Sequence, residues 1–244
     1  SFYIVEGEDR AAVIDTGISP GQKILPLIRK YTSKPLILVL THAHIDHWYH
    51  MDEFETVYMC HREFEVGPDA LRDMMADKDL CPERTLDIRT DTRIELGGPS
   101  LSICEVPGHT PGSVVVLDER SNRLFTGDAI GSGYGVWMQT PTAVPLETYY
   151  ESLVHLLKWL VDRGGRMSFH GGHRYQMFQS THVPSFNPPS LGLLCDLIDL
   201  VDQIVHGKIV GRISNVDNIM ELEPVLYAAY GRAEIQYKAS NIRI

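Results

Sequence analysis

The segment Thr41–His47 constrains this chain more than any other part, because it holds three histidines and one aspartate within six positions. It directly follows Leu36–Leu40, an unbroken apolar run typical of a strand that is buried on both faces. Ligands gather at the carboxyl ends of such strands in α/β sheets. Side chains two residues apart on an extended loop point to the same side, so the first two histidines can hold one cation while Asp46 and His47 face a neighbouring one. Ordinary surface residues are the alternative, but the position after a buried strand favours a metal-binding loop.

Three further residues of ligand type lie in turns that each follow a predicted strand. His109, Asp128 and His173 each come directly after a glycine. Glycine lets the backbone approach an ion without a side-chain clash. Each residue, taken alone, is more often a turn or cap residue. Their order along the chain after Thr41–His47 favours one shared site.

Together these residues resemble the metallo-β-lactamase superfamily. The likeness covers about Ala11 to Arg174 and rests on Asp15-Thr16-Gly17, on the H-x-H-x-D-H run, and on the three later residues in the same order. It implies an α/β (α+β) fold, namely a four-layer αββα sandwich with the site at one edge of the paired sheets. The order of the predicted strands and helices agrees with that layering.

The resemblance also implies a role for each ligand. The assignments are His42, His44 and His109 for the first metal, Asp46, His47 and His173 for the second, and Asp128 as the bridge between both. Asp15 would position the loop from behind. His170 stays open as an alternative last ligand, although the family pattern places a glycine directly before that histidine and so favours His173.

The expected chemistry is activation of water. Two divalent ions about 3.5–4 Å apart lower the pKa of a shared water and polarise a substrate oxygen. Asp46 is the catalytic candidate, because a carboxylate held by a cation keeps a lone pair that can take the proton. The segment Pro107–Gly112 resembles the esterase, lactonase and glyoxalase II side of the superfamily, and Asp128 stands where several true β-lactamases carry a cysteine. We therefore expect a binuclear metallo-hydrolase that cleaves an ester, thioester or lactone bond of a small molecule.

The identity of the metal follows from one position of this resemblance. His44 stands where the diiron flavoproteins of this fold carry a glutamate, which favours two zinc ions, with iron and manganese as alternatives. Three other functions stay open. They are a single-iron oxidoreductase like the sulfur dioxygenases, a phosphodiesterase, and a non-catalytic metal-binding scaffold.

The substrate pocket is the least constrained part of the site. Bulky side chains follow the fourth ligand, where the family commonly has small ones, and they predict a shaped rim. The segment after Asp128 adds a candidate apolar wall, and a tyrosine just past His173 is a candidate hydrogen-bond donor to the substrate oxyanion. Packing of the aromatic rings beneath the loop is the alternative. The candidate pocket residues are Trp48, Tyr49, His50, Trp137, Met138 and Tyr175.

The remaining pattern predicts the elements around this site. Short apolar runs predict a hairpin over residues 2–15, strands at 56–60 and 166–169, a meander of four strands between 93 and 126, and a terminal hairpin within 227–244. Helical spacing predicts helices at 21–31, 147–163 and 191–205, and a helical or flexible excursion at 63–78 that covers the site. We expect a catalytic core at 1–183 and a C-terminal extension at 184–244 that completes or covers it, with one domain over 1–244 as the alternative.

Composition narrows the partners and the compartment. A net charge of −10 without a run of Lys or Arg argues against a nucleic-acid partner. The longest apolar stretch, Leu153–Val161, contains His155 and Lys158 and is far shorter than the roughly 20 residues that span a bilayer. Widely spaced cysteines fit buried thiols in a reducing cytoplasm. We expect a cytoplasmic protein with a small-molecule substrate and no membrane partner, and a homodimer through the C-terminal segment stays open.

Overall fold

The predicted N-terminal hairpin is confirmed and starts the first of three sheets in the computed structural model, which describes residues 1–65, 80–131, 135–173, 189–214 and 223–243. β1 (Tyr3–Glu6) pairs antiparallel with β2 (Ala11–Ile14). Three parallel neighbours follow, β3 (Leu36–Val39), β4 (Val57–Met59) and β5 (Leu86–Asp87). β2 and most of β3 are buried, which explains why both strands are apolar throughout.

The second sheet contains the predicted antiparallel meander. Its strands are β6 (Arg93–Glu95), β7 (Ser100–Glu105), β8 (Val114–Asp118) and β9 (Arg123–Gly127). β11 (Ser168–Gly171) then pairs in parallel with β9 and sets Gly171 opposite Gly127. The residues that follow these two strands therefore leave the sheet next to each other, although they are far apart in sequence.

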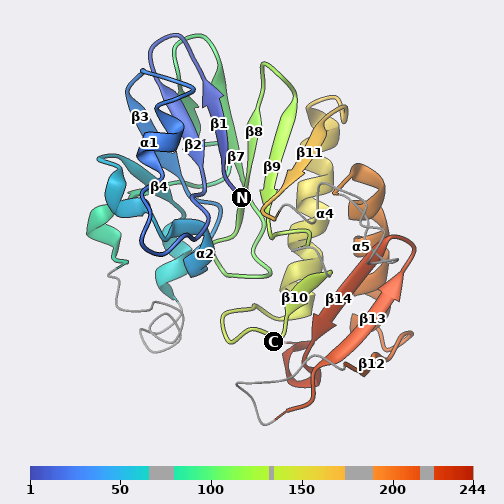
Figure 1. The fold of residues 1–244 in the computed structure, drawn as a ribbon. Helices are drawn as coiled ribbons and strands as arrows, with labels where there is room; N and C mark the ends of the chain where they lie inside the picture. Colours follow the sequence, from blue (N-terminus) through green and yellow to red (C-terminus); the bar gives the residue numbers. More distant parts are fainter. Residues whose placement is uncertain (66–79, 132–134, 174–188, 215–222, 244) are drawn as a thin grey trace.

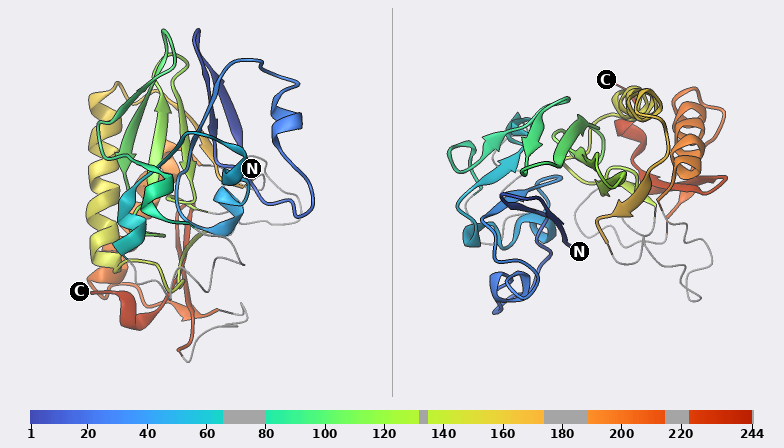
Figure 2. Two further views of the ribbon diagram at one scale, coloured as in Figure 1. Left: turned by 90° about the vertical axis from the view of Figure 1, so that its left-hand side faces the viewer. Right: turned by 90° about the horizontal axis from the view of Figure 1, so that it is seen from above.

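Helices cover the outer faces of these first two sheets, which confirms the four-layer αββα arrangement (Figure 1). α1 (Leu25–Ile28) and α2 (Ile45–Trp48) pack on the first sheet. α4 (Leu146–Asp162) packs on the second, and α5 (Leu191–Val205) lies alongside α4 (Figure 2). Apolar side chains from both sheets, among them Ile14 and Val116, form the middle core.

The first helix is shorter than predicted. Residues 21–31 were expected to be helical, but α1 has only four residues. Pro26 lies in its first turn, where its missing N–H is tolerated, and so prevents the helix from starting a turn earlier. The helices predicted at 147–163 and 191–205 are confirmed as α4 and α5.

A third sheet includes the predicted C-terminal hairpin and two strands, β10 (Val136–Met138) and β12 (Arg212–Ile213), that were not predicted. Its order is β10, β14 (Ala233–Tyr237), β13 (Leu226–Tyr230) and β12. β5, β10 and β12 have two or three residues each, too few to show a periodic pattern. The hairpin and α5 share one apolar core with α4. The predicted boundary at 183/184 falls outside the described residues and stays a prediction.

Short 3₁₀ turns complete the described chain. They are η1 (Met51–Glu53), η2 (His61–Glu65), η3 (Pro82–Arg84) and η5 (Ala239–Asn241). Most of the excursion predicted at 63–78 lies outside the described residues. Among the helices that the structure describes, none has both the length and the apolar character needed to cross a bilayer.

Candidate metal centre

Four segments meet beyond the strand ends of the first two sheets: the loop after β3, the turn between β7 and β8, and the residues after β9 and β11. Within the described residues, three groups of side chains each bring their candidate ligand atoms within 4.8 Å of one another. These groups are His42, His44 and His109; His42, His47 and Asp128; and Asp46, His47 and His173. The structure thus brings together every residue that the sequence predicted as a metal ligand.

His44 and His109 face each other with their ring nitrogens. Nδ1 of His44 and Nε2 of His109 are 2.8 Å apart. Nδ1 of His109 also lies 2.7 Å from the carbonyl oxygen of Trp137. This nitrogen is therefore the protonated one, and it donates a hydrogen bond to that oxygen. Nε2 of His109 is then left with a lone pair directed at the centre, which is the state that a metal-binding imidazole requires.

Asp128 lies between the two groups of nitrogens. Its Oδ1 is 3.8 Å from Nε2 of His47. Its Oδ2 is 3.1 Å from Nε2 of His173 and 3.8 Å from Nε2 of His109. The two oxygens of one carboxylate therefore face histidines of both predicted metal sites.

Several buried polar atoms of this cluster have no hydrogen-bond partner among the described residues. They are Nε2 of His42, Nε2 of His47 and Oδ1 of Asp128. A buried polar atom without a partner costs about 1–3 kcal/mol. Lone pairs of imidazole and carboxylate that converge in one buried place fit a bound cation, since nitrogen and oxygen of these groups are common ligands of divalent metals.

Asp15 supports the metal loop from behind, as predicted. Its carboxylate accepts hydrogen bonds from the backbone N–H and the hydroxyl of Thr41, both at 2.8 Å. Oδ2 of Asp15 also lies 2.8 Å from Nδ1 of His47. The hydroxyl of Thr41 is in turn 3.1 Å from Nδ1 of His42. This network leaves Nε2 of both histidines free to face the centre.

The cluster perturbs the pKa of its own members. Burial holds the pKa of His42 and His44 well below its usual range and also lowers that of His109. Burial opposes charge on His47 too, but the carboxylates of Asp15 and Asp128 outweigh it and raise the pKa of His47 to about 9. For Asp128, burial is opposed by neighbouring histidines, and the net effect is a lowered pKa.

Glu63 joins two of the loops and was not singled out from the sequence. The side chain is completely buried, and its Oε1 accepts a hydrogen bond of 2.5 Å from the hydroxyl of Thr110. Its Oε2 is buried and has no hydrogen-bond partner among the described residues, and burial raises the pKa of Glu63 to about 7. Since Thr110 directly follows His109, this side chain ties η2 to the turn that carries His109.

The predicted pocket residues differ in how deeply their side chains are buried. Trp48 and Met138 are completely buried in the core, and Nε1 of Trp48 donates to the carbonyl oxygen of Ala43. The prediction that they line an open pocket is therefore wrong, because both pack beneath the surface. Tyr49 is half-buried, Trp137 is 37% exposed, and His50 is buried.

Two further histidines and one tyrosine complete the comparison. His170 points away from the cluster, with Nε2 3.3 Å from the hydroxyl of Ser168 and its ring against Tyr3. His170 is in none of the three ligand groups of the described residues, whereas His173 is in one, so His173 stays the predicted last ligand. Nε2 of His61, in η2, lies 3.0 Å from the hydroxyl of Thr85. Tyr175 lies outside the described residues.

Gly172 allows the close approach on which the cluster depends. A Cβ atom at this position would lie 2.5 Å from Oδ1 of Asp128 and 2.7 Å from Cε1 of His47. Both distances are too short for real atoms, so only glycine lets the strand end pass this close to the site.

Known proteins are similar to this chain in sequence or in fold. The chain is 27% identical over 198 residues to the acyl-coenzyme A thioesterase MBLAC2 of Homo sapiens, a match that covers 67% of this chain and 69% of the relative. The solved metallo-beta-lactamase from Pontibacter korlensis superposes with a TM-score of 0.59 at 21% identity, over 82% of this chain and 85% of that chain. The protein TTHA1623, solved in a di-iron-bound form, superposes with a TM-score of 0.56 at 24% identity, over 80% and 91%.

The sequence profile of one family covers most of the chain. It is the profile of the metallo-beta-lactamase superfamily, and it matches residues 1–173, which include every member of the His/Asp cluster. This chain belongs to the metallo-beta-lactamase superfamily.

Proposed function

We propose that this chain is a hydrolase that holds two divalent metal ions and cleaves a thioester, ester or lactone bond of a small molecule. One observation carries the proposal: the carboxylate of Asp128 faces His47 and His173 of the second ligand group and also His109 of the first. A single ion needs only one such group. A buried carboxylate between two groups suits a bridge between two cations.

Each ligand has a role in this proposal. The first ion takes His42, His44 and His109, the second takes Asp46, His47 and His173, and Asp128 bridges both. Five imidazoles and two carboxylates suit zinc well, and iron and manganese are the alternatives.

Asp46 is the proposed catalytic residue. When bound, two divalent ions lower the pKa of a water between them and polarise the substrate carbonyl. The side chain of Asp46 is 34% exposed, whereas that of Asp128 is 5% exposed. An exposed carboxylate oxygen can accept a proton from water and pass it to the leaving group. The buried Asp128 can act only as a metal ligand.

A thioester is the first choice among the substrates. The curated relative that is 27% identical carries the name of an acyl-coenzyme A thioesterase, and its match covers about two thirds of both chains. Esters and lactones share the acyl carbon and the tetrahedral intermediate, so the same site can act on them.

A substrate screen tests the proposal. Metal-replete protein is assayed against an acyl thioester, an aryl ester, a lactone and a chromogenic phosphodiester, with Asp46→Asn as the control variant. We expect turnover of at least one acyl compound, none of the phosphodiester, and a loss of about 10²-fold or more in kcat for Asp46→Asn. Phosphodiester cleavage alone, or unchanged activity of Asp46→Asn, would contradict the proposal.

We also propose a cytoplasmic location and a small-molecule substrate as the partner. All four cysteines are free thiols, as in a reducing cytoplasm. A small-molecule substrate suits a buried metal cluster, and the acidic balance disfavours nucleic acid. A homodimer stays a prediction that gel filtration with light scattering can test.

A further inference from the structure

A cavity of about 590 Å³ lies directly beside the His/Asp cluster. Asp46 and His173 form part of its lining, so it opens onto the proposed second metal site. Its volume falls within the roughly 300–1,000 Å³ of small-molecule sites. The rest of the lining comes from the N-terminus and from the segment between β2 and α1.

Four apolar side chains belong to the lining of this cavity. They are Phe2, Ile18, Ile24 and Leu27. Ile18 is 50% exposed and Leu27 is 42% exposed. Single exposed apolar residues are ordinary on protein surfaces. Here they share one cavity with two proposed metal ligands, which is the arrangement expected of a binding site for an apolar group.

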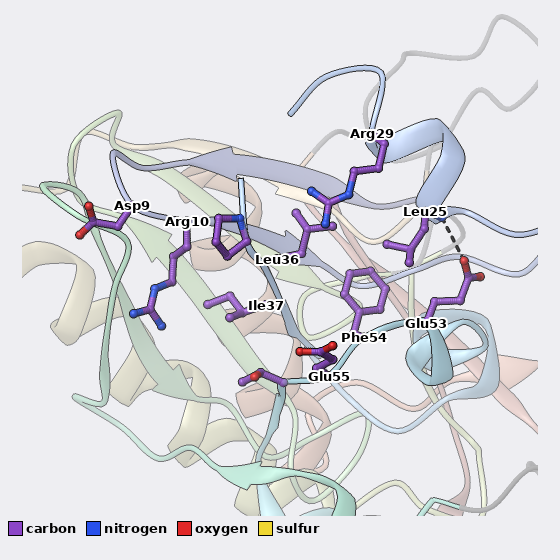
Figure 3. Close-up of a pocket in the computed structure, with 11 residues that line it drawn as sticks. Asp9, Arg10, Leu25, Arg29, Leu36, Ile37, Glu53, Phe54 and Glu55 are labelled. Atoms are coloured by element: carbon purple, nitrogen blue, oxygen red, sulfur yellow. Dashed lines mark hydrogen bonds between the residues drawn. The ribbon is translucent and has the colours of Figure 1, made fainter. Parts of the chain in front are cut away.

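A hydrogen-bond network holds the wall that carries Ile18. The hydroxyl of Ser19 is 2.9 Å from Nε2 of His50, and Nδ1 of the same ring is 3.0 Å from Oε1 of Glu53. Glu53 also accepts the backbone N–H groups of Ile24 at 3.1 Å and Leu25 at 3.0 Å, the latter drawn in Figure 3. The wall is therefore fixed at both its ends before a substrate arrives, which limits the entropy lost on binding.

Another cavity, of about 430 Å³, shows the contrast. It lies at the beginning of β3, whereas the metal loop follows the end of that strand (Figure 3). Arg10, Arg29, Glu53 and Glu55 bring charges of both signs into its lining. It has no proposed metal ligand and no reacting group beside it, so it gives no reason to expect substrate.

Resting on the proposed function, we propose that the 590 Å³ cavity holds the acyl chain of the substrate, while the scissile carbonyl lies at Asp46 and His173. Besides the apolar side chains, the lining has the neutral polar side chains of Thr16, Ser19 and Gln22, and one cationic side chain, Lys23; the terminal ammonium of Ser1 donates to the carbonyl oxygen of Gly172. A leaving group that carries several phosphates would need more cationic side chains than this. Ile18 and Leu27 are then specificity-determining residues, since they contact the chain and not the reacting bond.

Substitution of these residues tests the proposal through chain length. Two thioesters of the same thiol, decanoyl and acetyl, are compared in wild type, Ile18→Asn and Leu27→Asn. Each variant should lower kcat/KM for the decanoyl thioester about tenfold. The decanoyl chain then packs against a polar amide in place of one aliphatic side chain. The value for the acetyl thioester should stay the same, since an acetyl group does not reach the apolar wall.

Two control variants complete the design. Ile213→Asn replaces an isoleucine that is 70% exposed on β12 and should change neither kcat/KM value. Lys23→Ala removes the charge of the same cavity and should leave the preference for the decanoyl thioester intact. An equal loss for both thioesters in Ile18→Asn and Leu27→Asn would overturn the proposal, as would a loss only in Lys23→Ala, which would show that the cavity takes an anionic leaving group.

A binding measurement separates this proposal from the proposed function. The decyl thioether of the same thiol cannot be hydrolysed, and its binding to metal-free protein is measured by calorimetry. We expect binding with a negative heat-capacity change that is weakened about tenfold in Ile18→Asn. If no thioester were hydrolysed but this binding were found, the proposed function would fail and the apolar cavity would stand. Thioether binding that is unchanged in both Ile18→Asn and Leu27→Asn would overturn the cavity proposal.

Discussion

Oδ2 of Asp15 lies 2.8 Å from Nδ1 of His47, and both side chains are buried. This contact holds the imidazole with its Nε2 toward the metal cluster. The same Asp15 carboxylate accepts the backbone N–H of Thr41, so it fixes the start of the metal loop as well. Asp15 itself has a φ of 58°, a conformation that Asp adopts more readily than most residues.

Asp15→Asn should weaken zinc affinity by about 10–100-fold, because the ring of His47 loses the partner that orients it. Competition with a chromogenic chelator measures this change. Asp162→Asn, at the exposed end of α4, serves as the matched control and should bind zinc as the wild type does. Equal affinity in Asp15→Asn and wild type would show that this contact does not support the site.

Zinc binding at pH 7.5 should release a proton from His47. Its pKa is raised to about 9 in the metal-free protein, so the ring is charged at this pH and must lose its proton to bind a cation. The same raised pKa means that the ion pair of His47 with Asp15 and Asp128 stabilises the metal-free fold below about pH 6.5. This stabilisation is lost as the pH rises through 9. Calorimetry in buffers of different ionisation enthalpy counts the released protons, and a heat independent of the buffer would contradict the prediction.

Glu63→Gln should flatten the dependence of stability on pH. Burial raises the pKa of Glu63 from 4.5 to about 7, so the folded state holds a proton that the unfolded state has released. The free energy of unfolding should therefore fall as the pH rises from 4.5 to 7, by about 3 kcal/mol for this group. Urea denaturation of metal-free protein at a series of pH values measures the slope, and an identical slope in Glu63→Gln would rule out this origin.

The grouping of the His/Asp cluster was predictable because its signal lies in one loop and in the order of three later residues along the chain. The Thr41–His47 loop shows four ligand-type side chains at once, and the parallel pairing of β11 with β9 brings His173 to Asp128. The contacts that orient the ligands were not predictable. His44 meets the hydroxyl of Thr142 at a separation of 98 residues, and Glu63 reaches Thr110 across 47 residues. No local pattern in the sequence marks such pairs.

The substrate side was misjudged for a related reason. Trp48 belongs to a helix of only four residues, which is too short to show an apolar face by periodicity. Its position after the ligands suggested a rim, whereas the ring is buried beneath them. Ile18 and Leu27 precede the metal loop in sequence. Only the fold brings them into the lining of the same cavity as Asp46.

Titration of metal-free protein with zinc, followed by thioester hydrolysis, tests the central claim most directly. If Asp128 bridges two ions, activity should rise until two zinc ions per chain are bound, and metal analysis of the active protein should give the same stoichiometry. Full activity with one iron per chain and uptake of dioxygen, or hydrolysis that is unaffected by removal of metal, would contradict a two-metal hydrolase.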